Sequence, residues 1–150
     1  MTTFKHLLVA TDFSKASEAG IRTARDLAGQ LGARVSVVHV CEEILLPMIF
    51  TTEEQRTEFH EESLKVSRER LDACIHEHFG DLPAEARLRY GSPAAEIVAC
   101  AREVEADLVV LASHGRGSVG QLVFGSTAQR VIHSAPCPTV VVRPQEDTAS

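Results

Sequence analysis

The sequence contains no tryptophan and only one tyrosine, and its 15 Lys and Arg residues are outnumbered by 21 Asp and Glu residues. The resulting net charge is −6. A chain without a basic face or interleaved aromatic side chains is not expected to bind nucleic acid. Its longest apolar run, residues 44–50, is far too short to span a bilayer, so the sequence also predicts no insertion into a membrane.

Cysteines are few and far apart. Cys41, Cys74, Cys100 and Cys137 include no C-x-x-C pair. The first residues, MTTFKHLLVATD, contain a single Lys and reach an Asp after a short apolar stretch, which is not the pattern of a signal peptide. We therefore expect reduced thiols rather than disulfides or zinc ligands, and a cytoplasmic protein.

Five short apolar segments predict β-strands. Four of them are nearly continuous runs of Val, Leu and other apolar residues, which is typical of strands covered on both faces of a parallel sheet. The segments are His6–Ala10, residues 35–40, residues 86–90, Leu108–Ala112 and Thr139–Val142.

Between these strands the apolar residues recur at helical spacing, and residues typical of helix ends flank each segment. The first predicted helix follows Ser14 and ends at Gly32, the second covers Glu53–Phe79 and is closed by Gly80, the third opens with Ser92-Pro93 and runs to about Glu105, and the fourth begins near Gly125-Ser126 and stops at Ala135.

The alternation βαβαβαβαβ predicts an α/β fold, a doubly wound and Rossmann-like five-stranded parallel sheet with helices on both faces. We expect one domain at residues 1–143 and a flexible tail at residues 144–150. Ligands of such sheets bind beyond the carboxyl ends of the strands, where the strand order reverses. The polar turn Thr11-Asp12 follows the first strand and a glycine-rich loop follows the fourth. This pairing favours the order 3-2-1-4-5 over 2-1-3-4-5, with the site between strands 1 and 4.

The glycine-rich stretch from Ser113 to Thr127 contains parts of two phosphate-binding motifs, and neither is complete. Gly115, Gly117 and Gly120 spell G-x-G-x-x-G, but they follow the fourth strand instead of the first. From Gly120 onward the segment has the spacing of a P-loop, but Ser126 stands in the place of the lysine that neutralises the phosphates.

A more general property of this stretch survives. Its glycines leave backbone N–H groups open to an anion, and the helix that begins after Gly125 favours phosphate at its N-terminus. Ser126 and Thr127 add hydroxyl donors, and Arg116 adds positive charge. The alternative is a flexible connection followed by an ordinary helix cap.

At this point the residues resemble the universal stress protein family. The matching stretches are LLVATDFS from residue 7, VVHV from residue 37, GSPAAEIV from residue 91, ADLVVLASHGRG from residue 106 and SAPCPTVVVR from residue 134. Nucleotide-binding members of that family carry G-x2-G-x9-G-[S/T] after the fourth strand. Here Gly115 and Gly125-Ser126 match the pattern, whereas Ala112 takes the place of its first glycine. The resemblance implies the same sheet, in the order 3-2-1-4-5.

The resemblance also implies ATP, or another adenine nucleotide, as the ligand, with Mg²⁺ or Mn²⁺ sharing the phosphate charge. The implied binding residues are Ala10, Thr11 and Asp12 at the adenosine, Val40 at the adenine, and Ala112, Gly115, Gly125, Ser126 and Thr127 at the phosphates. We add Arg116 to the expected phosphate site for its positive charge alone. The Asp12 carboxylate at the tip of a strand can hold a ribose hydroxyl or a metal ion, and its alternative role is helix capping. If the position of Ala112 needs a positive φ, alanine costs about 1 kcal/mol there. If glycine serves only close approach, one methyl is tolerated.

The resemblance further implies a regulatory protein that forms a homodimer through the strand from Thr139 to Arg143, since an apolar edge strand invites pairing. Two alternatives stay open. One is a slow ATP hydrolase or phosphotransferase with Asp12 or His114 as the base, and the other is a nucleotide-free dimeric adaptor. We expect binding rather than catalysis and assign no catalytic residue. The sequence does not identify a protein partner or the residues that hold a metal.

Overall fold

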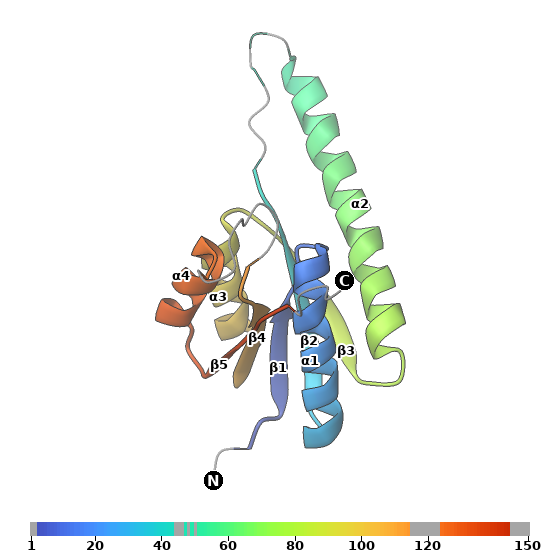
Figure 1. Ribbon diagram of the computed structural model, residues 1–150. Helices are drawn as coiled ribbons and strands as arrows, with labels where there is room; N and C mark the ends of the chain where they lie inside the picture. Colours follow the sequence, from blue (N-terminus) through green and yellow to red (C-terminus); the bar gives the residue numbers. More distant parts are fainter. Residues whose placement is uncertain (1–2, 44–46, 48, 50, 115–123, 145–150) are drawn as a thin grey trace, which may run out of the picture.

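The computed structural model describes residues 3–43, 47, 49, 51–114 and 124–144. Along these residues strands and helices alternate without exception. They are β1 (His6–Ala10), α1 (Lys15–Leu31), β2 (Arg34–Cys41), α2 (Glu53–Phe79), β3 (Ala84–Tyr90), α3 (Pro93–Glu103), β4 (Leu108–Ala112), α4 (Ser126–Ser134) and β5 (Thr139–Val142). Figure 1 shows the helices arranged around the central strands.

The strands form one five-stranded sheet in the order β3-β2-β1-β4-β5, and every neighbouring pair is parallel. This confirms the predicted fold class and the predicted order. The direction of winding reverses between β1 and β4, because β2 lies on one side of β1 and β4 on the other. The predicted switch point therefore stands at the carboxyl ends of these two strands.

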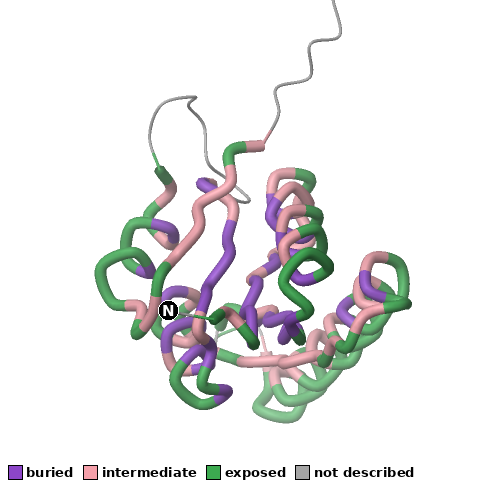
Figure 2. Tube along the Cα trace, turned by 90° about the horizontal axis from the view of Figure 1, so that it is seen from below, coloured by how far each residue is buried: buried purple, intermediate pink, exposed green. Residues whose placement is uncertain are grey.

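Alternate strand residues supply two separate cores, one on each face of the sheet. Leu7 and Val9 of β1 pack with α1 and α2, whereas Leu8 packs with α3 and α4. Figure 2 shows the buried segments on the inside of the molecule and the exposed ones on the outer turns of its helices. Burial on both faces explains why the strand sequences read as continuous apolar runs instead of alternating ones.

Local signals set the helix ends close to where the sequence predicts them. The Ser14 hydroxyl accepts a hydrogen bond from Ser17 N, and Gly32 closes α1 with φ 65°. Thr52 caps α2 in a reciprocal pair of hydrogen bonds with Gln55. The third helix ends at Glu103 and not at the expected Glu105, because Glu105 itself adopts φ 56°, which a right-handed helix cannot accommodate.

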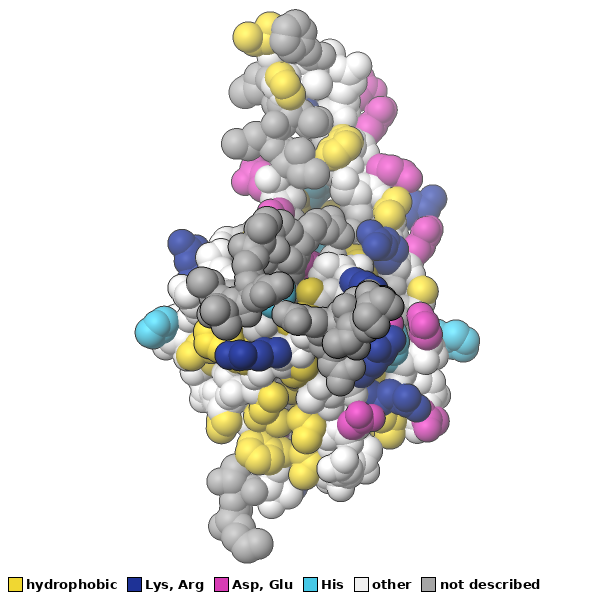
Figure 3. All heavy atoms as spheres, in the orientation of Figure 1, with side chains coloured by type: hydrophobic (Ala, Val, Ile, Leu, Met, Phe, Trp, Pro, Cys, Tyr) yellow, Lys and Arg dark blue, Asp and Glu magenta, His cyan; other side chains and the backbone are white. Residues whose placement is uncertain are grey.

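Helix α2 is longer than the sheet that it covers. Its 27 residues correspond to about 40 Å, and its N-terminal half rises beyond the other elements (Figure 1). Leu71 and Phe79, in the C-terminal half, are fully buried against the sheet. The protruding half exposes a series of acidic side chains along its outer edge (Figure 3). Only part of α2 therefore belongs to the core.

A polar chain that starts at the buried residues His6 and Ser36 links the first three strands at the end of the sheet opposite the switch point. His6 Nε2 lies 2.7 Å from Ser36 Oγ, and Ser36 in turn donates to Glu85 Oε1 at 2.8 Å. Burial lowers the pKa of His6, and the charge of Arg34 lowers it further. His6 Nδ1 is buried without a hydrogen-bond partner among the described residues. Because the Ser36 hydroxyl proton goes to Glu85, His6 Nε2 donates to Ser36 Oγ.

Candidate functional site

A cavity of about 700 Å³ opens at the carboxyl ends of β1, β2 and β4. This volume is within the range usual for small-molecule sites. The cavity lies at the switch point and is lined by every predicted site residue that the structure describes: Ala10, Thr11, Asp12, Val40, Ala112, Gly125, Ser126 and Thr127. Gly115 and Arg116 lie outside the described residues. The fold thus brings together side chains that are more than 100 positions apart in the sequence.

The turn after β1 is held by its own hydrogen bonds. Thr11 N donates to Val38 O at 2.9 Å, and the Thr11 hydroxyl lies 3.1 Å from Ser17 Oγ and accepts from Phe13 N at 3.0 Å. Asp12 Oδ1 accepts from Ser14 N at 2.9 Å. Asp12 therefore shapes the start of α1, as its alternative role requires, and it also lines the cavity.

Phe13, the next residue of this turn, has φ 64°, in the left-handed region that bulky residues rarely adopt. Neighbouring side chains fix it there. Its ring lies 4.2 Å from the His39 ring, and the guanidinium carbon of Arg70 stands 4.5 Å from its centroid. His39 Nδ1 donates to the Thr11 carbonyl at 2.7 Å. Side chains from β2 and α2 therefore hold the conformation of the β1–α1 turn.

The two ends of the glycine-rich loop meet at the edge of the cavity. Ser113 N donates to Val142 O, and Gly125 N donates to Ser113 O, both at 2.8 Å. Gly125 is the N-cap of α4 and has no side chain with which to satisfy the first N–H groups of that helix. No acidic residue stands in the first turn of α4. The cavity is therefore bordered by a helix N-terminus, which favours an anion.

Ala112 is the last residue of β4 and pairs with Val142 of β5. Among the described residues other than glycine, only Phe13 and Glu105 have a positive φ. The backbone at Ala112 therefore needs no glycine, and alanine imposes no strain there. The sequence leaves two reasons for glycine at this position of the family pattern, a positive φ and close approach to a ligand. Only close approach remains.

Ser113 and His114 follow Ala112 and turn toward each other. Ser113 is buried, and its hydroxyl lies 2.9 Å from His114 Nδ1. The His114 side chain also lines the cavity. This contact holds the His114 ring at the cavity. The alternative hydrolase hypothesis names this same ring as a possible base.

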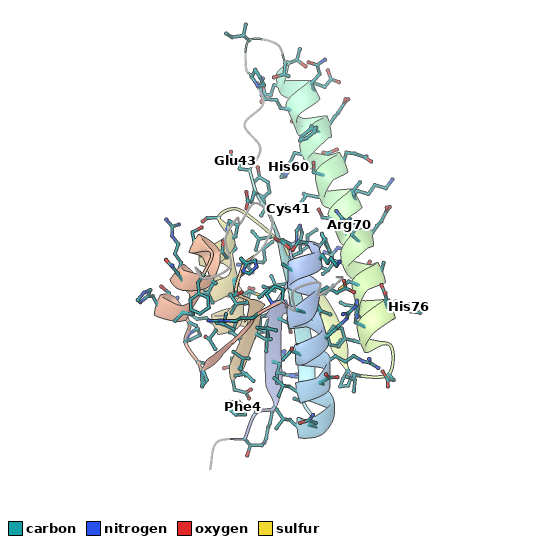
Figure 4. The ribbon with its side chains drawn as sticks, viewed as in Figure 1. Phe4, Cys41, Glu43, His60, Arg70 and His76 are labelled. Atoms are coloured by element: carbon teal, nitrogen blue, oxygen red, sulfur yellow. The ribbon has the colours of Figure 1, made fainter. Side chains whose placement is uncertain are left out.

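Sequence reasoning missed a whole wall of the cavity, which is formed by α2. The lining residues from this helix are Phe59, Glu62, Ser63, Val66 and Ser67. Their spacing of three and four marks one stripe of a helix. Figure 4 shows Cys41, at the end of β2, at a height between His60 and Arg70 of α2. The sequence contains the helical spacing, but it does not indicate that α2 extends past the sheet edge.

The remaining reactive side chains of the described residues do not form a second site. Within the described part of the chain, no group of three or more His, Cys, Asp and Glu residues is placed to hold a metal ion. The four cysteines are unpaired, and burial raises the pKa of Cys74 to about 11. The Cys74 thiol is therefore protonated at neutral pH and is a poor nucleophile. No helix among the described residues is long and apolar enough to cross a membrane.

Comparisons with known proteins agree with this fold. A sequence model of the universal stress protein family matches residues 3–143. A Thermus aquaticus protein, named the universal stress protein in the QAH/OAS sulfhydrylase 3′ region, is 36% identical over 143 residues, which cover 93% of this chain and 99% of that protein.

Solved structures show the same architecture. Hypothetical protein MJ0577 aligns with a TM-score of 0.84 at 22% identity, over 97% of this chain and 100% of its own. A universal stress protein in complex with cAMP aligns with a TM-score of 0.63 at 19% identity, covering 96% and 100%. The Archaeoglobus fulgidus universal stress protein in complex with dAMP has a TM-score of 0.58 at 26% identity, covering 93% and 98%. With the match to nearly its whole length, the chain belongs to the universal stress protein family.

Proposed function

We propose that this protein is a regulatory stress-response protein that binds ATP, or another adenine nucleotide, in the crevice between β1 and β4. The observation that carries the proposal is that the predicted binding residues converge on one cavity, although they come from β1, β2, β4 and α4. The A. fulgidus relative, solved with dAMP at 26% identity, supports an adenine nucleotide as the ligand.

In this proposal the two ends of the nucleotide meet different chemistry. The backbone of Val40, at the end of β2, pairs with the adenine, and the turn at Thr11-Asp12 meets the ribose. The free N–H groups at the start of α4, with the Ser126 and Thr127 hydroxyls, hold the phosphates through hydrogen bonds and the helix dipole. The loop residues Gly115 and Arg116 belong to the same phosphate site in the proposal.

Mg²⁺ or Mn²⁺ would neutralise the phosphates further. The Asp12 carboxylate is the acidic group at the β1 turn that could approach such an ion, since it lines the cavity. Without three acidic or imidazole ligands grouped among the described residues, the phosphate oxygens would supply most of the remaining ligands.

We propose binding rather than turnover as the activity, with occupancy changing conformation, assembly or partner affinity. The edge strand β5 supports assembly with a second copy, because its outer edge has no neighbouring strand in the sheet and its four residues are only partly buried. A cytoplasmic location is part of the same proposal and is supported by the unpaired thiols.

The change Gly125→Val tests the phosphate site. Gly125 has φ −61° and ψ 158°, a conformation open to valine, so the variant should fold normally and place a branched side chain beside the first turn of α4. We expect the ATP affinity to fall by at least about tenfold, because each lost phosphate contact is a charge-assisted hydrogen bond. Ile132→Ala is the control, since Ile132 is a half-exposed residue of the same helix outside the cavity.

Unchanged ATP affinity in Gly125→Val would refute the assigned phosphate site. A wild-type protein whose melting temperature does not respond to ATP with Mg²⁺ would instead favour the nucleotide-free adaptor. Repeated ATP turnover that is lost in Asp12→Ala or His114→Ala would establish the hydrolase alternative.

A further inference from the structure

The α2 stripe that lines the cavity is apolar at two positions, and the protein covers both side chains only in part. Phe59 and Val66 are each 43% exposed, whereas Leu71 and Phe79, further along the same helix, are buried. Ser63 lies between the two apolar residues and Ser67 directly follows Val66, and both serines also line the cavity. An apolar surface that faces a cavity gains free energy when a ligand covers it.

Ring contacts hold α2 near both ends of this stripe. At one end the His60 ring meets the Tyr90 ring edge-on, with centroids 4.5 Å apart. At the other end Arg70 lies over Phe13 of the β1–α1 turn. These two residues are about 15 Å apart along the helix. The segment between them, which carries Ser63, Val66 and Ser67, is therefore held at both ends, and Phe59 directly precedes it.

Other elements also supply apolar lining residues. They are Val40 and Cys41 at the end of β2 and Ile97 of α3, and the carboxylates of Glu42 and Glu62 line the same cavity. A cavity with apolar residues from several elements and polar groups beside them suits a flat heteroaromatic ring, which buries its faces and leaves its edge to polar partners. The N-terminus of α4, where the proposed function puts the phosphates, borders the same cavity. A ligand with a ring at one end and phosphates at the other fits this division.

We propose that the stripe formed by Phe59, Ser63, Val66 and Ser67 is the base-stacking wall of the site, and that it covers one face of the purine base. The proposal rests on the proposed function and adds to it a base-stacking element on α2. Phe59 stacks on the base and Val66 extends the apolar contact, while Ser63 and Ser67 face the edge of the base or the ribose. His60 and Arg70 are positioning residues that hold the wall in place.

The test separates the two ends of the ligand. Nucleotide-free wild type, Phe59→Ala and Phe59→Tyr are titrated calorimetrically with ATP, with adenosine and with inorganic tripolyphosphate. Leu31→Ala is the matched control, because Leu31 is 42% exposed and lies outside the cavity. All variants should melt like wild type, since half-exposed surface residues contribute little to stability.

We expect Phe59→Ala to weaken ATP and adenosine by the same factor, on the order of tenfold, as is usual for the loss of a base-stacking ring. Tripolyphosphate affinity should not change, and Phe59→Tyr and Leu31→Ala should bind like wild type. The α2 assignment is wrong if wild type binds ATP and Phe59→Ala binds it equally well. It is also wrong if the tripolyphosphate affinity of Phe59→Ala falls by the same factor as its ATP affinity. If wild type binds neither ATP nor adenosine, the proposed function itself fails.

Discussion

Replacing Ala112 by glycine restores the first glycine of the nucleotide-binding pattern, and we expect it to lower stability without improving binding. Ala112 ends β4, pairs with Val142 and does not have a positive φ. Glycine there relieves no strain and loses more backbone entropy on folding, at a cost of about 0.5–1 kcal/mol. For a chain of this length the melting temperature should fall by about 1–4 °C.

The effect on the ligand is bounded by one methyl group. Ala112 lines the cavity, so its methyl contributes at most about 0.8 kcal/mol of apolar contact, which is about fourfold in affinity. The ATP dissociation constant of Ala112→Gly should therefore be unchanged or up to about fourfold higher. Thermal unfolding and calorimetric titration measure the two effects on the same preparation.

Two results would refute this reasoning about Ala112. Higher stability in Ala112→Gly would show backbone strain at a position where φ indicates none. ATP binding about tenfold tighter would show that close approach of the nucleotide at this position does not tolerate one methyl group.

The remaining predictions concern the stability of the fold. Gly32→Ala should cost about 1 kcal/mol because Gly32 has φ 65°, whereas Gly29→Ala, where an added Cβ meets no atom within 4 Å, should stabilise α1 by up to about 1 kcal/mol. A free energy of unfolding in urea that is higher for Gly32→Ala than for Gly29→Ala would contradict this. Burial lowers the pKa of His6, so the unfolded chain takes up a proton first as the pH falls, and wild type should lose stability below about pH 6.5. His6→Gln, which keeps a donor toward Ser36, should remove that part of the pH dependence, and identical profiles would show that His6 carries none of it.

The sheet was predictable because burial on both faces leaves a direct mark on the sequence. The apolar runs of β1 and β4 mark strands covered on both sides, and the positions of the polar turn and the glycine-rich loop indicate the strand order. Strand ends were less predictable. β3 begins at Ala84, earlier than expected, because its polar residues lie on a half-exposed edge and give no continuous apolar run.

The site was predictable where it is made of loops at strand ends, and not where it is made of packing. Thr11 and Asp12 follow a strand directly, so their place at the switch point could be inferred from order alone. The wall formed by Phe59 and Val66 depends on the length of α2 relative to the sheet, which no local pattern encodes. The left-handed conformation of Phe13 likewise depends on His39 and Arg70, which are distant in sequence.

The most direct test of the central claim is to map ATP binding residue by residue. Backbone amide NMR spectra of nucleotide-free, isotope-labelled protein should be followed as ATP with Mg²⁺ is added. We predict saturable shifts centred on Thr11, Asp12, Val40 and the start of α4 at Ser126, with little change at the opposite end of the sheet near His6. The absence of saturable shifts, or shifts centred away from the crevice between β1 and β4, would contradict the proposed nucleotide site.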